Sequence, residues 1–175
     1  MNEDKLQLPG FLIADLYKNS LVIMDDVPKT VITTTKQGKT TENRQWYLGS
    51  NLQKITILVN EKDAVYLGDE SLQFLSAILG ACKLNLGDVA IVNHLNDPLV
   101  YTEIKEKLSP AFLILFGVDA KDIRLSFTIP HYQVQKYDNS QILLVPELGA
   151  MLGNSQEAKL EKSKLWLCLK KMFAI

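Results

Sequence analysis

Residues 142–173 read ILLVPELGAMLGNSQEAKLEKSKLWLCLKKMF, and this stretch decides the fold class. Its first four residues are apolar and in part β-branched, as in a strand that is covered on both faces. Asn154 and Glu157 have the spacing of a capping box, which predicts a long amphipathic helix beginning near Asn154. The buried face of this helix is predicted to consist of Ala158, Leu165, Leu169 and Met172, with Trp166 and Phe173 alongside.

The same alternation of strand and helix runs through the preceding part of the chain. Buried strands are predicted at residues 55–59, 89–92, 111–116 and 141–145. Helices are predicted at residues 69–82, capped by Asp69, and 98–108, capped by the run Asn96-Asp97-Pro98. Residues 128–134 are expected to be an irregular extended stretch at the sheet edge. We therefore predict one three-layer α/β/α domain over residues 51–175, with a mainly parallel sheet of about four or five strands.

Residues 1–50 differ from the rest of the chain in amino-acid composition. Phe11, Leu12, Leu16 and Tyr17 form an apolar cluster, and residues 21–24 read as a short strand. Residues 30–45, TVITTTKQGKTTENRQ, are polar and threonine-rich, which is typical of a loop or linker. The apolar cluster either docks on its own domain or anchors in the groove of a protein partner, and the sequence leaves both open.

Composition excludes several classes of protein. The 175 residues include 19 Lys and Arg against 20 Asp and Glu, scattered rather than clustered, so strong direct binding to nucleic acid is not expected. Cys82 and Cys168 both fall in apolar helical patterns and are expected to be buried thiols rather than cofactor ligands. The N-terminus MNEDKLQLPG lacks the features of a secretory signal, and no apolar run is long enough for a membrane span, so a cytoplasmic protein without a cofactor is expected.

Polar residues follow each of the predicted strands. In an open α/β sheet, ligands bind at the carboxyl ends of the strands, so these residues are the candidate site. They are Glu61, Asp63, Asn93, His94, Pro146 and Glu147. His94 with Asp63 or Asp97 supplies too few strong ligands for a metal site, and no Gly-x-Ser-x-Gly elbow or phosphate-binding glycine loop is present.

The order of these elements resembles the uracil-DNA glycosylase superfamily. The resemblance covers residues 55–173: a strand ending in Asn93, a strand closing with Leu115-Phe116-Gly117, and a terminal strand–Pro146–helix–Trp166 unit. The differences between this chain and that family lie in the catalytic motifs. Val145 and Glu147 stand where that family has the His and Ser around its proline, and a valine cannot donate a hydrogen bond to a developing oxyanion. The sequence NEKDA at residues 60–64 replaces the glycine- and proline-containing loop that positions water in that family.

One group with this fold lacks the catalytic motifs, namely the psi subunits of bacterial DNA polymerase III. The chain resembles them in having an N-terminal segment before a single glycosylase-like domain. The psi subunits carry a partner-binding peptide in this segment, and the resemblance places Phe11, Leu12, Leu16 and Tyr17 in the corresponding position. This resemblance implies a non-catalytic subunit of a DNA replication complex that contacts clamp-loader proteins. The alternatives are a divergent glycosylase or related hydrolase using Glu61, Asp63, Asn93 or His94, and an unrelated α/β binding module.

Overall fold

The computed structural model describes residues 45–175 of the chain. The elements predicted between residues 11 and 24 and most of the polar stretch after them lie outside the described residues. Among residues 45–175, no helix is long and apolar enough to cross a membrane.

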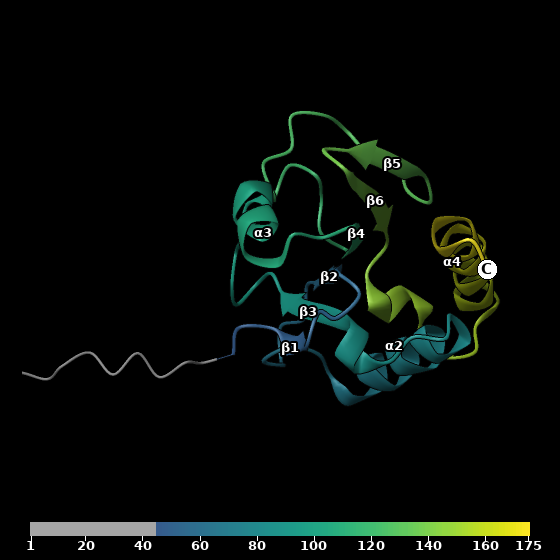
Figure 1. The fold of residues 1–175 in the computed structure, drawn as a ribbon. Coiled ribbons are helices and arrows are strands. Elements are labelled where there is room, and N and C mark those ends of the chain that lie inside the picture. Colours follow the sequence, from purple (N-terminus) through teal and green to yellow (C-terminus); the bar gives the residue numbers. More distant parts are fainter. Residues whose placement is uncertain (1–44) are drawn as a thin grey trace, which may run out of the picture. The chain divides into compact units, whose positions relative to one another are not determined.

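A six-stranded mixed sheet forms the centre of the described domain (Figure 1). Its strands are β1 (Leu48–Gly49), β2 (Ile55–Val59), β3 (Val89–Asn93), β4 (Phe112–Phe116), β5 (Val134–Tyr137) and β6 (Ser140–Val145). They lie in the order β1-β3-β2-β4-β6-β5, with parallel pairing among the inner four and antiparallel pairing at both edges. The expected α/β class is therefore confirmed, and the expected number of strands is too low because two short edge strands were not recognised as such.

The inner strands are buried on both faces, as their apolar sequences predict. Every residue of β2 and β3 is buried, and Ile57 pairs with Ile91 on one side and Ile114 on the other. A strand without a solvent-facing side has no reason to alternate polar and apolar residues, so continuous β-branched runs are stable here.

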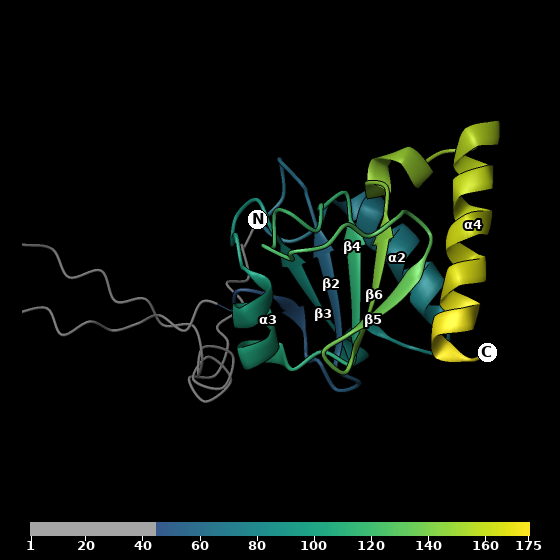
Figure 2. The same ribbon diagram turned by 90° about the horizontal axis from the view of Figure 1, so that it is seen from above.

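Helices cover the sheet on both faces (Figure 2). The helices are α2 (Asp69–Ala81), α3 (Tyr101–Leu108) and α4 (Gln156–Phe173), with short 3₁₀ turns at Leu86–Asp88 and Leu148–Met151. One core cluster joins α2 and α4 to the sheet through Leu75, Leu79, Leu165 and Leu169. The other joins α3 and the irregular segment after β4 to the opposite face, through residues such as Ile104 and Ile123.

The predicted helix caps require correction. Gly68 rather than Asp69 is the N-cap of α2, and no side chain caps that helix. Asn96 does not cap α3, because its side-chain amide donates instead to the carbonyls of Ala64 and Val65, at 3.0 and 2.9 Å. α3 consequently begins three residues after Pro98, at Tyr101.

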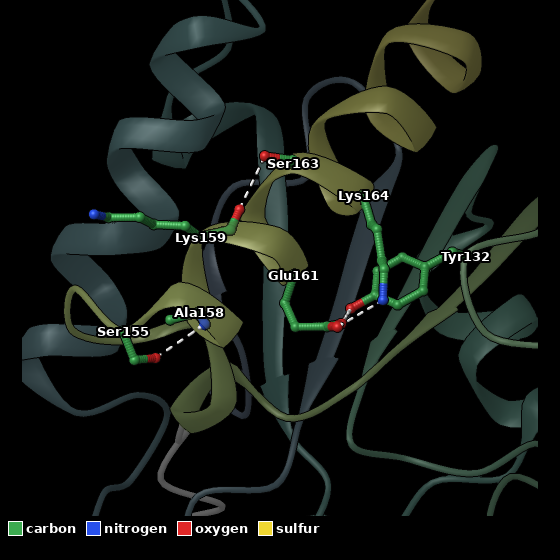
Figure 3. Close-up of polar contacts among 7 residues, drawn as sticks. All are labelled: Tyr132, Ser155, Ala158, Lys159, Glu161, Ser163 and Lys164. Atoms are coloured by element: carbon green, nitrogen blue, oxygen red, sulfur yellow. Dashed lines mark hydrogen bonds and ion pairs between the residues drawn. The ribbon is translucent and has the colours of Figure 1, made fainter.

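The start of α4 is also shifted from the prediction. Ser155 is its N-cap, with Oγ accepting a hydrogen bond from the Ala158 amide at 3.0 Å (Figure 3). The buried face is as predicted, with Ala158, Leu165, Leu169 and Met172 all buried. Ser and Asn are comparable caps, so sequence spacing alone does not separate adjacent candidates.

The stretch predicted as irregular and extended, residues 128–134, overlaps the edge strand β5 only at Val134, because β5 lies later in the chain. β5 and β6 form a tight hairpin whose central residues, Asp138 and Asn139, have φ of 50° and 63°. Two consecutive positive φ angles are typical of the type I′ turn that matches the twist of paired strands, and Asp and Asn tolerate them.

Candidate functional site

The carboxyl ends of the four parallel strands meet at one edge of the sheet. β3 pairs with β2 on one side and β4 pairs with β2 on the other, so the strand order reverses between β2 and β4. In doubly wound folds this switch point is where loops diverge and leave room for a ligand. The predicted residues Glu61, Asn93, His94 and Glu147 all follow or end strands at this edge.

Asn93 is 1% exposed, and every atom of its amide group is used inside the protein. Its Nδ2 donates to the carbonyls of Glu61 and Ala64 at 2.7 and 2.9 Å. Its Oδ1 accepts from the amides of Glu61 and Leu95 at 3.2 and 3.3 Å. Asn93 therefore holds the loop between β2 and α2, and it has no capacity left to bind a ligand.

Two further side chains after β2 make hydrogen bonds within the protein, and Asn60 Oδ1 is buried without a partner. The Glu61 carboxylate accepts a hydrogen bond of 2.7 Å from the Ser71 hydroxyl on α2. Asn60 Nδ2 donates across the switch point to the Gly117 carbonyl after β4, at 2.6 Å. These bonds join the loops after β2 and β4 where a doubly wound fold would admit a ligand. Asp63 lies in the same loop and is exposed.

The loops after β4 and β6 are in close contact. Gly117 has φ +64°, and a Cβ placed on it would lie 2.9 Å from Glu147 Cβ. Only glycine accommodates both the left-handed backbone and this approach. Pro146 is half-buried and Glu147 is exposed. Both lie at the carboxyl edge, but within residues 45–175 no hydrogen bond joins their side chains to Glu61 or Asn93.

His94 is the one residue of this set with an unused buried group. Its Nδ1 is buried and has no hydrogen-bond partner. Burial lowers the pKa of His94 below its ordinary value of 6.5, and the nearby Asp122 carboxylate opposes this change. Burial thus favours the neutral form of the imidazole.

Neither metal nor thiol chemistry finds support in the described part of the chain. Residues 45–175 contain no group of three or more His, Cys, Asp or Glu placed to hold a metal ion. Burial raises the pKa of the Cys82 thiol, and it also raises that of Cys168, where Lys171 opposes it. Raised thiol pKa values are those of structural rather than nucleophilic cysteines.

A second surface, which was not recognised in the sequence, is an apolar groove between α2 and α4. It has a volume of about 270 Å³. Its walls are formed by Phe74, Ala77, Ile78 and Ala81 of α2 and by Lys162 and Trp166 of α4, above the buried Leu165 and Leu169. Phe74, Ile78 and Trp166 are apolar in the sequence, but only the folded chain shows that they are partly covered.

The lysines of α4 are in part engaged with the protein rather than simply solvated. Lys162 donates to the Gly153 carbonyl at 2.8 Å, and its ammonium lies 5.5 Å from the centre of the Phe74 ring. Lys170 lies over the Trp166 ring at 5.8 Å. Both lysines therefore stand above aromatic rings of the groove walls, at a distance where a cation and an aromatic face attract.

The opposite flank of α4 is joined to the segment before β5 (Figure 3). Glu161 accepts hydrogen bonds from the Tyr132 hydroxyl and, at 2.8 Å, from Lys164. The bond from Lys164 lowers the pKa of Glu161 most, and the bond from Tyr132 lowers it further. Burial raises the pKa of Tyr132, and so does the hydrogen bond to Glu161. This flank of α4 is thereby fixed, in contrast to the groove on its other side.

No protein-family model and no curated protein sequence matches this chain. The geometry of the carboxyl edge and of the groove is therefore what supports a function. The residues Phe11, Leu12, Leu16 and Tyr17, predicted to bind a partner, lie outside the described residues.

Proposed function

We propose that this protein is a non-catalytic protein-interaction subunit of a DNA replication complex, similar to the psi subunits associated with bacterial clamp loaders. The observation that carries the proposal is the apolar groove between α2 and α4, bounded by Phe74, Ile78 and Trp166. A groove with apolar walls and few polar groups suits a protein side chain better than a polar substrate.

α4 also carries two exposed leucines, which do not line the groove. Leu160 and Leu167 are seven residues apart on one side of the helix and are 55% and 62% exposed. Single exposed apolar residues are ordinary, but two that are about two helical turns apart on one helix face form a second apolar surface of the kind that protein partners cover.

The state of the carboxyl edge supports the non-catalytic part of the proposal. General acid–base chemistry needs a group that is free to reach a substrate and has a suitable pKa. Asn60 is instead bonded to the loop after β4, Glu61 to α2, and Asn93 to the loop after β2. Val145 offers no donor at the end of β6.

The experiment is co-purification of the tagged full-length chain with bacterial clamp-loader subunits, expressed together. We expect a complex that elutes as one peak in size-exclusion chromatography. Replacing Phe11 and Leu12 by Ser should weaken it if those residues anchor the partner, whereas replacing Thr33 and Thr34 by Ser in the polar stretch should not. Absence of any complex with the unaltered chain would refute the replication assignment.

His94 supports a second candidate, a divergent glycosylase-type enzyme. A neutral imidazole with an unpartnered Nδ1 at the carboxyl edge is a group that could contact a substrate. Uracil-containing single- and double-stranded DNA provides the test. Release of free uracil that is abolished by His94→Gln or Asp63→Ala would establish this candidate and refute the non-catalytic one.

A further inference from the structure

The α2 wall of the groove carries small residues. Ala77, Gly80 and Ala81 of α2 are exposed, and a Cβ added to Gly80 would meet nothing within 4 Å. On the other wall, Trp166 is partly buried and supplies a broad apolar surface. Small residues let the backbone of a bound element approach α2 closely, while Trp166 and Ile78 provide the apolar contact area.

The charged side chains along the groove are positive. Residues 71–81 of α2 carry no charged side chain, and residues 162–173 of α4 carry four lysines and no carboxylate. Of these lysines, Lys164 is paired with Glu161 on the far flank, whereas Lys162 and Lys170 stand over the rings of Phe74 and Trp166. The rim of the groove is therefore positive, and a complementary partner carries acidic residues beside its apolar ones.

The length of the groove sets the size of its ligand. The α2 wall runs from Phe74 to Ala81, which at about 1.5 Å per residue is roughly two helical turns. A helix of that length presents about three apolar side chains at positions i, i+3 or i+4, and i+7 on one face. An extended strand would require a free sheet edge, which neither wall of this groove provides.

We infer that the groove between α2 and α4 binds an amphipathic helix of a partner protein, with its apolar face on Ile78 and Trp166 and its acidic flanks beside Lys162 and Lys170. This inference rests on the proposed function as a protein-interaction subunit, and it names the surface and the chemistry of the partner.

The first experiment follows Trp166 fluorescence in the full-length chain. The sequence contains two tryptophans, so Trp46→Phe leaves Trp166 as the reporter. The probe is a synthetic 16-residue amphipathic helical peptide with Leu on one face and Glu on both flanks. We expect a saturable blue shift, because the helix excludes water from the indole. No response up to ~1 mM peptide, equivalent to about 4 kcal/mol of binding, overturns the inference.

Matched variants on α2 locate the binding surface. Ala77→Glu places a carboxylate in the wall of the groove and should weaken peptide binding at least about tenfold. Gln73→Glu adds the same charge on the same helix at an exposed position that does not line the groove, and should leave binding within about twofold. Both positions are exposed, so both variants are expected to fold, and circular dichroism checks this. Equal binding by the two variants overturns the assignment to the groove.

Further outcomes identify other occupants. A peptide with Lys in place of Glu should bind at least about tenfold less tightly, and equal binding overturns the predicted acidic partner. A concentration-dependent dimer that Ala77→Glu dissociates would make a second copy of this chain the occupant. A Trp166 response to single-stranded DNA that is abolished by salt and by Lys162→Glu would make nucleic acid the ligand.

Comparison with the co-purification experiment separates this inference from the proposed function. Peptide binding without clamp-loader association leaves the groove assignment standing and removes the replication assignment. Clamp-loader association that Ala77→Glu leaves intact, together with no peptide binding, refutes the groove assignment alone.

Discussion

The carboxyl edge of the sheet and the groove between α2 and α4 differ in how their side chains are used. At the edge, Asn93 and Glu61 make hydrogen bonds within the protein. In the groove, Ile78 and Trp166 keep apolar surface that no part of the described chain covers fully. The comparison teaches that polar residues at the ends of parallel strands do not by themselves mark a binding site, because the loops there also need polar groups to hold them together.

Asn93→Ala is expected to have the largest effect on stability. It removes four hydrogen bonds and leaves the part-buried carbonyl and amide of Glu61 without this partner. Buried polar groups without partners cost about 1–3 kcal/mol each, so we expect the free energy of unfolding to fall by about 3 kcal/mol. Urea denaturation measures it.

Asn96→Ala is the matched control for Asn93. Its amide also donates to the Ala64 carbonyl, but the residue is exposed. Water can replace its bonds, so a loss of about 1 kcal/mol or less is expected. If the two variants proved equally stable, Asn93 would not be the residue that holds the loop, and a ligand-binding role for its amide would become the better explanation.

A pair of glycines tests the close packing of the edge against the open surface of α2. Gly117→Ala combines a left-handed backbone with a Cβ 2.9 Å from Glu147 Cβ, and should reduce stability by about 2 kcal/mol. Gly80→Ala meets no atom within 4 Å in a helix and should increase stability by about 0.5 kcal/mol. Thermal melts monitored by circular dichroism give both signs. A tolerated Gly117→Ala would contradict the contact between the loops after β4 and β6.

Tyr132→Phe probes the fixed flank of α4. The variant loses the hydroxyl that donates to Glu161, at a partly buried position, and we expect a loss of about 1 kcal/mol. Combining it with Glu161→Gln in a double-mutant cycle isolates the pair. A coupling energy near zero would mean that α4 is held by its buried leucines alone.

The smallest effect is expected from the pH dependence conferred by His94. Burial lowers the pKa of His94, so between pH 6.5 and the folded-state pKa the unfolded chain binds a proton that the folded chain does not. This contribution to stability is therefore present above pH 6.5 and is lost as the pH falls. Unfolding in urea at about pH 7.5 and about pH 5.5 should show a smaller difference for His94→Gln than for the unaltered chain. An unchanged difference would mean that His94 titrates normally.

The core of the fold was predictable because its signals are local and apolar. The runs at residues 55–59, 89–92 and 111–116 are typical of strands covered on both faces, and the structure has strands at Ile55–Val59, Val89–Asn93 and Phe112–Phe116. The stripe through Leu165 and Leu169 likewise fixes the buried face of α4. The edge strand β5 was harder to locate, since its residues are mixed and half-exposed.

The roles of polar residues were less predictable, because each depends on which partner the folded chain brings near. Asn96 is of a residue type that often caps helices, yet its side-chain amide donates hydrogen bonds to the loop after β2, more than 30 residues earlier in the chain. The groove was missed for a related reason. Ala77 and Ala81 are unremarkable in the sequence, and only the approach of Trp166 from α4 turns them into one wall of a groove.

The bond between Glu61 and Ser71 affects the entropy of binding at the groove between α2 and α4. Asn93 fixes the Glu61 backbone, the Glu61 carboxylate holds Ser71, and Ser71 lies one helical turn before Phe74 in the groove wall. The first turns of α2 are thus ordered before any ligand arrives. A helix that binds there loses its own conformational freedom but does not have to immobilise this wall, and a preorganised wall raises affinity without adding a single contact.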